Sequence, residues 1–179
     1  HPRKRPFDVL ASARLLLRRL PETVYIIAGT GVQRDEVIAA ARNQGLSESF
    51  RFPGWVDYSR MPELMRLADV VVMASEAEGL ARAYLEAMSC ERVLVASDIP
   101  PAKEVVEHGR NGLIFPLGDT DALAEETFRA LIEPGLQRRL GSAARRTVSD
   151  RSVRAIAPRY IQEFADLVRR RRAGGAMTS

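Results

Sequence analysis

Two glutamates separated by seven residues, Glu78 and Glu86, are the side chains whose types and spacing most suggest chemistry. They lie in the stretch "SEAEGLARAYLEAMSC", which directly follows an apolar run at 70–74. A carboxylate at a strand end and a second one on the following helix flank the amides of the first helical turn, and such amides bind phosphate. A rise of about 1.5 Å per residue would separate the two carboxylates by roughly 12 Å. We interpret this spacing as the layout of a sugar, a diphosphate and a ribose.

The surroundings of Glu86 bear on this interpretation. The residues three and four positions away share its helix face, and they are Arg82, Ala83, Ser89 and Cys90. Apart from the arginine these side chains are small, so a ligand has room to approach, and Glu86 could then accept hydrogen bonds from both ribose hydroxyls. The alternative is an ordinary helix whose two carboxylates are solvated, and from these residues alone both interpretations stay open.

Composition restricts the class of protein. The chain has 179 residues, of which 46% are hydrophobic and 28% charged, as in one compact globular domain. No apolar run approaches the roughly 18 residues of a membrane-spanning helix, and no signal peptide is apparent. The single cysteine excludes an internal disulfide and is typical of a reducing compartment. We therefore expect a cytoplasmic protein.

The charge of the chain suggests its kind of partner. The net charge of +4 is concentrated at the two ends, in "HPRKR" and in the arginines at 169–172. This pattern favours phosphates or lipid headgroups over nucleic acid. We expect no nucleic-acid partner and keep open a peripheral contact with the inner face of the membrane.

Apolar strands alternate with helices along the chain. Strands are expected at 24–29, 50–56, 69–75, 93–97 and 111–115, and helices at 7–20, 35–44, 61–68, 78–90, 120–132 and 151–172. This alternation predicts an α/β fold, with a Rossmann-like, mostly parallel sheet that carries helices on both faces. Ligands of such sheets bind at the carboxyl ends of the strands, where "GTG", "PGWVDYS", "SEAEG" and "SDIPPAKE" follow. Because no strand precedes the first helix, we interpret the chain as part of a longer protein.

Several segments together resemble one enzyme family. "EGLARAYLEAMSC" resembles the E-x7-E signature of retaining glycosyltransferases with the GT-B fold, family-4 type, also called glycosyl transferases group 1. "KRPFDVLASA", "YIIAGTG", "FRFPGWV" and "EVVEHGRNGLIFPLGD" resemble further segments of that family in the same order. The resemblance implies that residues 1–172 are the C-terminal half of a GT-B fold, which binds the nucleotide-sugar donor. It also implies that the N-terminal acceptor domain is absent from this chain, and we expect residues 173–179 to be a disordered tail.

The resemblance assigns roles to individual residues. It implies that Glu78 is catalytic and lies beside the donor sugar, and that Lys4 neutralises the leaving diphosphate, with Arg5 as the alternative. The remaining positions implied to bind the donor are Glu86 for the ribose, the amides of Gly79, Leu80 and Ala81 for the sugar and diphosphate, and the main chain of Trp55 and Val56 for the base.

The implied activity is transfer of a sugar, of hexosyl type, from a UDP- or GDP-sugar to an acceptor hydroxyl with retention of configuration. No cofactor or protein-held metal is expected, and we expect this chain alone to be inactive because the acceptor site is missing. Two alternatives remain, namely a nucleotide-sugar-binding subunit that works with a separate acceptor-domain chain, and a GT-B sugar-nucleotide epimerase. The base, sugar, acceptor and linkage stay open.

The chain departs from the family pattern at three places. Ala81 replaces the second glycine of the signature, Glu91 replaces the glycine after Cys90, and Pro100-Pro101 replaces a glycine pair. Glu91 brings the geometry of the helix end into question, because this position commonly needs glycine. The proline pair brings the fit of the donor sugar into question.

Overall fold

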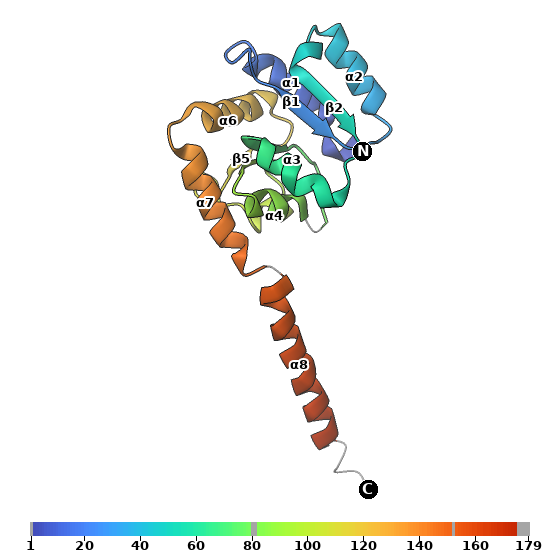
Figure 1. Ribbon diagram of the computed structural model, residues 1–179, viewed down its shortest axis with the longest axis vertical. Helices are drawn as coiled ribbons and strands as arrows, with labels where there is room; N and C mark the ends of the chain where they lie inside the picture. Colours follow the sequence, from blue (N-terminus) through green and yellow to red (C-terminus); the bar gives the residue numbers. More distant parts are fainter. Residues whose placement is uncertain (1, 80–81, 152, 175–179) are drawn as a thin grey trace.

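The computed structural model describes residues 2–79, 82–151 and 153–174, which form an α/β domain followed by one long helix (Figure 1). The strands are β1 (Tyr25–Ala28), β2 (Phe50–Gly54), β3 (Val70–Met73), β4 (Val93–Ser97) and β5 (Leu113–Phe115). The α-helices are α1 (Pro6–Leu16), α2 (Arg34–Asn43), α3 (Met61–Leu67), α4 (Arg82–Ser89), α5 (Pro100–Lys103), α6 (Thr120–Ile132), α7 (Leu136–Ser149) and α8 (Val153–Gly174). Short 3-10 helices are η1 (Pro2–Lys4), η2 (Ser47–Ser49) and η3 (Tyr58–Arg60).

All paired strands are parallel, and helices flank them, which confirms the predicted α/β class. The strands form two sheets, β1-β2 and β3-β4-β5, and no strand within the described ranges hydrogen-bonds one sheet to the other. The register pairs Tyr25 with Phe50 in the first sheet and Val70 with Val93 in the second. The single sheet suggested by the alternation of elements is therefore divided in two.

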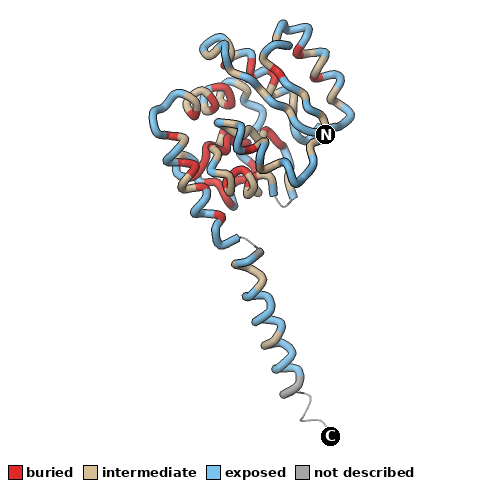
Figure 2. Tube along the Cα trace, in the orientation of Figure 1, coloured by how far each residue is buried: buried red, intermediate tan, exposed pale blue. Residues whose placement is uncertain are grey.

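Strand β4 lies at the centre of the second sheet and is buried along its whole length. Leu94 and Ala96 face a core that also contains residues of α4 and α7. Val93 and Val95 face the opposite core, which α6 and the start of α7 complete. A strand covered on both faces has to be apolar throughout, and this explains why "VLVAS" shows no alternation of polar and apolar residues. Figure 2 shows buried residues gathering around these elements.

Helix α1 joins the two halves of the domain. Leu10 and Ala13 pack with Ala41 and Phe50 in the core of the first sheet, while Val9 packs against the core of the second. The same helix packs on α6. Since η1 leads directly into α1, the position of this helix also decides where the basic residues at the N-terminus lie.

Helix α7 is an element that the sequence interpretation missed. Its buried residues include Leu136, Leu140, Ala144 and Val148, at regular spacings of four, and this period is the signal that would have revealed it. Gly141 within it obscured the pattern. The structure explains that glycine, because a Cβ there would lie 2.2 Å from the carbonyl oxygen of Glu91. Close packing of α7 on the end of α4 requires a residue without a side chain.

Helix α4 ends in a Schellman motif, although glycine is absent from it. The N–H of Arg92 donates to Ala87 O at 3.2 Å and that of Glu91 to Met88 O at 3.1 Å, which is the hydrogen-bond pattern of this motif. Glu91 occupies the left-handed position with φ 59°. Helix α2 ends in the same pattern with Gly45, at φ 72°, in the corresponding place. The helix end that the sequence brought into question thus keeps the usual geometry, but with a strained residue.

We expect Glu91→Gly to stabilise the protein by about 1 kcal/mol. A non-glycine residue in the left-handed region costs roughly 1–2 kcal/mol, and the greater freedom of glycine in the unfolded chain offsets part of this gain. Urea unfolding of parent and variant measures the difference. Glu91→Ala is the control, since it removes the side chain but keeps the Cβ that causes the strain. Equal stabilisation by alanine would show that the charge of Glu91, and not its backbone, is unfavourable.

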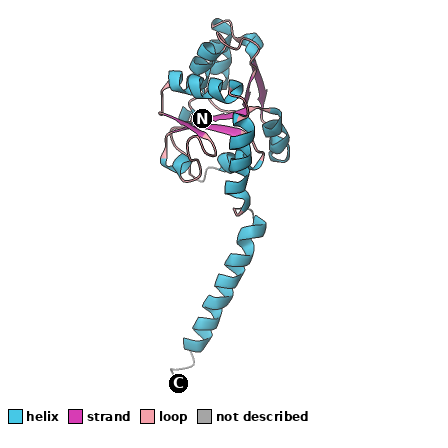
Figure 3. Ribbon diagram, turned by 90° about the vertical axis from the view of Figure 1, so that its left-hand side faces the viewer, coloured by secondary structure: helices cyan, strands magenta, loops and turns pink. Residues whose placement is uncertain are grey.

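Helix α8 extends away from the domain, as Figures 1 and 3 show. None of its residues between Arg154 and Arg171 is buried. Large apolar side chains lie along it, with exposed fractions of 51–69%: Tyr160, Ile161, Phe164, Leu167 and Val168. The helix predicted for this region is confirmed, but its apolar stripe packs on nothing in the domain.

Candidate functional site

The loop after β3 lies where the sequence placed the candidate site. Ala74 and Ser75 are buried, and the hydroxyl of Ser97, the last residue of β4, donates to Ser75 O at 2.5 Å. The start of the loop is thus fixed to the neighbouring strand end. In the first sheet the strand ends are joined in a similar way, by Gly29 N donating to Gly54 O at 2.7 Å.

Three contacts join residues 3–5 to residues 76–78. The N–H of Glu76 donates to Arg3 O at 2.9 Å. The Lys4 ammonium lies 2.5 Å from Glu78 Oε1, and the Arg5 guanidinium lies 3.6 Å from the Glu76 carboxylate. Lys4 and Glu78, which are 74 positions apart in the chain, are therefore direct neighbours.

The two partners of the Lys4–Glu78 pair differ in exposure. The side chain of Lys4 is 52% exposed, whereas that of Glu78 is 15% exposed. Solvent screens the exposed ammonium, so the pair contributes on the order of 1 kcal/mol or less. A pair this weak can open when a stronger anion approaches Lys4, because breaking it costs little.

Arg5 is held by more contacts than Lys4. It precedes α1 in the left-handed conformation, at φ 48°, and its Nε lies 2.6 Å from Asp8 Oδ2. The hydrogen bond and charge of Asp8, followed by those of Glu76, raise the pKa of Arg5. Its Nη2 also lies close to Gly118, since a Cβ added to that glycine would be 3.3 Å from it. Arg5 thus connects η1, α1 and the loop after β5, whereas Lys4 has the more exposed cation.

Glu86 lies on α4 and is partly buried. Within the described part of the chain its carboxylate makes no hydrogen bond or ion pair, so its oxygens are available to a ligand. Glu78 and exposed Gly79 precede α4 and are not helical. The separation of roughly 12 Å assumed a continuous helical rise and does not apply here. The predicted amides of Leu80 and Ala81 lie outside the described residues.

Trp55 and Val56 follow β2, at the carboxyl edge of the first sheet. Trp55 is 76% exposed, and Val56 is partly buried. Gly54 before them has φ 74°, which turns the chain at the end of the strand. No hydrogen bond or ion pair among the described residues joins this segment to Glu78 or Glu86. The structure therefore brings Lys4 and Glu78 together and keeps the predicted base-binding segment on the other sheet.

Tyr84 is a polar residue next to this site to which the sequence interpretation gave no role. It is fully buried, and no hydrogen bond of ordinary geometry joins its hydroxyl to a described residue, although Ser97 lies close enough to affect its pKa. Burial, together with the negative charge of Glu78, raises the pKa of Tyr84 to about 12. The signal available in the sequence was a hydroxyl on an otherwise apolar helix face, between the two candidate glutamates.

Residues 2–79, 82–151 and 153–174 contain no group of three or more His, Cys, Asp or Glu side chains placed to hold a metal ion. The helices among them include none with the length and hydropathy that crossing a bilayer requires.

The family is decided by sequence. The family model of Glycosyl transferases group 1 matches residues 1–147. The chain belongs to this family. Among its relatives, the glycogen synthase of Mycobacterium tuberculosis is 32% identical over 158 residues, which are 88% of this chain and 38% of the synthase. The alpha-D-kanosaminyltransferase of Streptomyces kanamyceticus is 29% identical over 135 residues, which are 75% of this chain and 35% of that enzyme.

Solved structures agree on the fold of this group 1 domain. The crystal structure of Anabaena Alr3699/HepE in complex with UDP superposes with a TM-score of 0.83 at 24% identity, covering 93% of this chain and 46% of that protein. The expected GT-B type of fold is thus confirmed. The chain spans about two fifths of the length of the curated relatives it matches.

Proposed function

We propose that this chain is the donor-binding domain of a retaining glycosyltransferase of the family-4 type, which transfers a sugar from a nucleoside-diphosphate sugar to an acceptor hydroxyl. The observation that carries the proposal is the Lys4–Glu78 pair at the carboxyl edge of β3. These two residues are the ones that the family resemblance makes catalytic. The UDP bound to the structurally similar HepE supports a uridine diphosphate donor. The acceptor hydroxyl would be bound by a second domain of the whole protein.

Lys4 and Glu78 would stabilise charges of opposite sign that develop during the reaction. The bond between the anomeric carbon and the diphosphate oxygen breaks, and its electron pair leaves with the diphosphate. The acceptor oxygen bonds to the same face of the carbon, and its proton passes to the departing diphosphate oxygen. The Lys4 ammonium stabilises the negative charge that develops on the diphosphate, while the Glu78 carboxylate stabilises the positive charge on the sugar. Lys4 therefore has to exchange Glu78 for the diphosphate when the donor binds.

We expect Glu86→Ala to weaken binding of UDP to the full-length protein about 10- to 150-fold. The carboxylate would accept hydrogen bonds from the ribose, and such charged hydrogen bonds contribute about 1.5–3 kcal/mol. Isothermal calorimetry with parent and variant measures the change. The 2′,3′-dideoxy nucleotide is the control ligand: it should bind more weakly to the parent by a similar factor, and equally to both proteins. The same UDP affinity for parent and variant would remove Glu86 from the site.

We expect Glu78→Gln, in the full-length enzyme, to lower kcat on the order of 10²-fold, as does loss of one preorganised electrostatic partner. Affinity for the bare nucleoside diphosphate should not weaken, because that ligand has no sugar to meet Glu78 and Lys4 no longer has to leave a carboxylate. Steady-state kinetics and calorimetry measure the two quantities.

Glu125→Gln is the matched control for this experiment. Glu125 lies on α6 and pairs with Arg19, also at 2.5 Å, so the variant loses an ion pair of the same kind away from the strand ends. Its kcat should equal that of the parent. If Glu78→Gln is as active as Glu125→Gln, the catalytic role of Glu78 is wrong.

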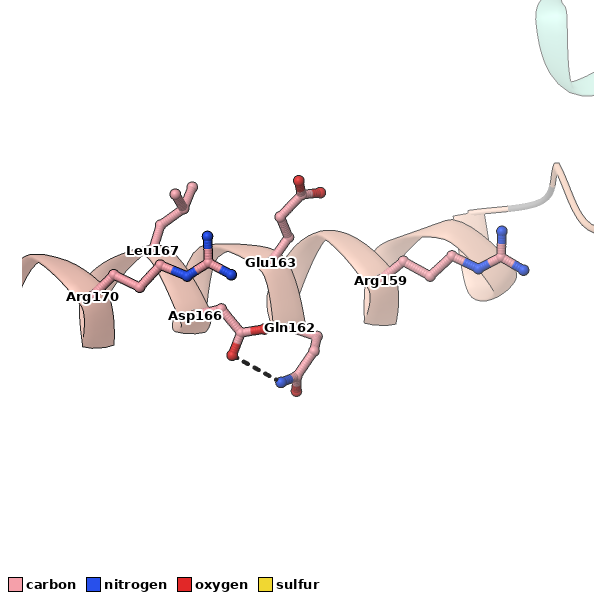
Figure 4. A pocket seen from close by; sticks show the side chains of 6 residues that line it. All are labelled: Arg159, Gln162, Glu163, Asp166, Leu167 and Arg170. Atoms are coloured by element: carbon pink, nitrogen blue, oxygen red, sulfur yellow. Dashed lines mark hydrogen bonds between the residues drawn. The ribbon is translucent and has the colours of Figure 1, made fainter.

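We also propose that the acceptor-binding domain of the whole protein covers the apolar stripe of α8. The support is the exposure of Tyr160, Ile161 and Phe164, together with the relatives' greater length. Polar side chains flank the stripe, and Figure 4 shows those of Arg159, Glu163 and Arg170 spread along one isolated helix. The shallow hollow between them is lined only by residues of α8, so it has no second wall within the described chain.

We expect Phe164→Asp to lower the unfolding temperature of the full-length protein, because it places a charge in a buried interface. Gln162→Lys adds a charge on the opposite face of α8, beside Asp166, and should have no such effect. Differential scanning calorimetry compares the variants, and sedimentation with anionic vesicles is measured in parallel. If Phe164→Asp abolishes vesicle binding but leaves the unfolding temperature unchanged, the stripe contacts a membrane instead.

A further inference from the structure

Arg5 is the residue at which the chain turns from η1 into α1. Its N–H donates to Pro2 O at 2.9 Å, and its carbonyl oxygen accepts the N–H of Asp8 at 3.1 Å. Between these two hydrogen bonds its backbone is left-handed, with φ 48° and ψ 53°. Such a conformation persists only where the surroundings hold it. The direction of η1, and with it the place of Lys4, therefore depends on the contacts that keep Arg5 in this conformation.

The side chain of Arg5 is held from three sides. Its Nε lies 2.6 Å from Asp8 Oδ2, and its Nη1 lies 3.6 Å from Glu76 Oε2. Gly118 leaves space for the guanidinium, since a Cβ there would be 3.3 Å from Nη2. The Asp8 side chain is 17% exposed and that of Glu76 is 43% exposed, so solvent screens the Asp8 pair less. Asp8 is thus the closer and better-shielded of the two anionic partners.

A bound nucleotide-sugar donor would meet two neighbouring cations at this turn. Lys4 contacts Glu78, and Arg5 contacts Glu76, two positions earlier in the same loop. A diphosphate attracts both cations, and the planar guanidinium of an arginine suits phosphate oxygens well. If Arg5 also left its partners, the strained turn would lose the contacts that hold it. An exchange that involves Lys4 alone therefore requires a group that retains Arg5.

We propose that Asp8 is a positioning residue of the transfer reaction, which holds Arg5 in the turn while the donor diphosphate draws Lys4 away from Glu78. This inference rests on the proposed function, since it requires a diphosphate that competes for Lys4. Asp8 acts through Arg5 and does not contact the donor. It lies in the first turn of α1, a helix that packs on the cores of both sheets, so its carboxylate has a fixed support. Lys4 then changes its partner by moving its side chain alone.

The test is Asp8→Asn in the full-length enzyme, with kcat from steady-state kinetics and UDP affinity from calorimetry. We expect kcat to fall about tenfold, because Lys4 is no longer held where charge develops on the diphosphate. UDP should bind as tightly as to the parent or more tightly, because the released Arg5 becomes a second cation for the diphosphate. A merely structural Asp8 would weaken UDP binding and kcat together. That result, or an unchanged kcat, would overturn the proposal.

Two further variants show whether the charge of Asp8 acts at this place. Asp8→Glu keeps a carboxylate within reach of Arg5 and should retain about half or more of the parent's kcat. Glu126→Gln is the matched control: Glu126 lies on α6, is 20% exposed and pairs with Arg129 three positions along the chain. Its kcat should equal that of the parent. If Asp8→Asn is no slower than Glu126→Gln, or if Asp8→Glu is as slow as Asp8→Asn, the proposal is wrong.

A double-mutant cycle with Lys4→Ala shows whether Asp8 acts through the position of Lys4. In the Lys4→Ala background, Asp8→Asn should lower kcat no further, whereas independent effects would multiply and contradict the proposal. The cycle also distinguishes the two hypotheses. An unchanged kcat in Lys4→Ala alone would contradict the proposed function. A slow Lys4→Ala enzyme combined with a fully active Asp8→Asn enzyme would contradict only the role of Asp8.

Discussion

The attachment of residues 3–5 to residues 76–78 is the constraint on which the candidate site depends. The position of Lys4 depends on this attachment, because η1 is a single short turn that buries none of its residues. The backbone hydrogen bond from Glu76 to Arg3 and the anchoring of Arg5 on Asp8 hold that turn against the loop after β3. Arg5 adopts a left-handed conformation at this point, which costs energy for a residue with a Cβ. This strained conformation occurs directly after the turn that places Lys4 beside Glu78.

Lys4 and Arg5 differ in their contacts, and this difference suits them to different roles. A residue that holds a loop in place should make several contacts, as Arg5 does with Asp8 and Glu76. A residue that has to change partners should make one contact that solvent weakens, as Lys4 does. Of the two neighbouring cations, Arg5 thus has the contacts of a residue that fixes the loop, and Lys4 has the single contact of a residue that can exchange its partner. Their order in the chain alone does not distinguish them, but the contacts of each side chain do.

The elements and the site differ in how far the sequence could predict them. Continuous apolar runs predicted β3 and β4, because these strands are covered by helices and need no polar face. The helix expected at 120–132 is α6, and the Asp119 carboxylate caps its start by accepting the N–H of Ala122 at 2.9 Å. In contrast, α7 was missed, because Gly141 interrupts its pattern. The reason for this glycine is a close contact with Glu91, which lies 50 positions away in the chain. Family resemblance implied separate roles for Lys4 and Glu78 but not their contact, since local patterns carry no information on which distant side chains meet.

Tyr84 illustrates the same limit at the level of one atom. Helical periodicity correctly placed its ring on the buried face of α4, together with Met88. Periodicity distinguishes apolar from polar faces, however, and a tyrosine belongs to both classes. Only the packing around the ring shows that the hydroxyl is enclosed near Ser97, at the end of β4. The sequence could therefore place the ring on the correct face of the helix, but it could not show which polar group the hydroxyl meets, because that group comes from another element of the fold.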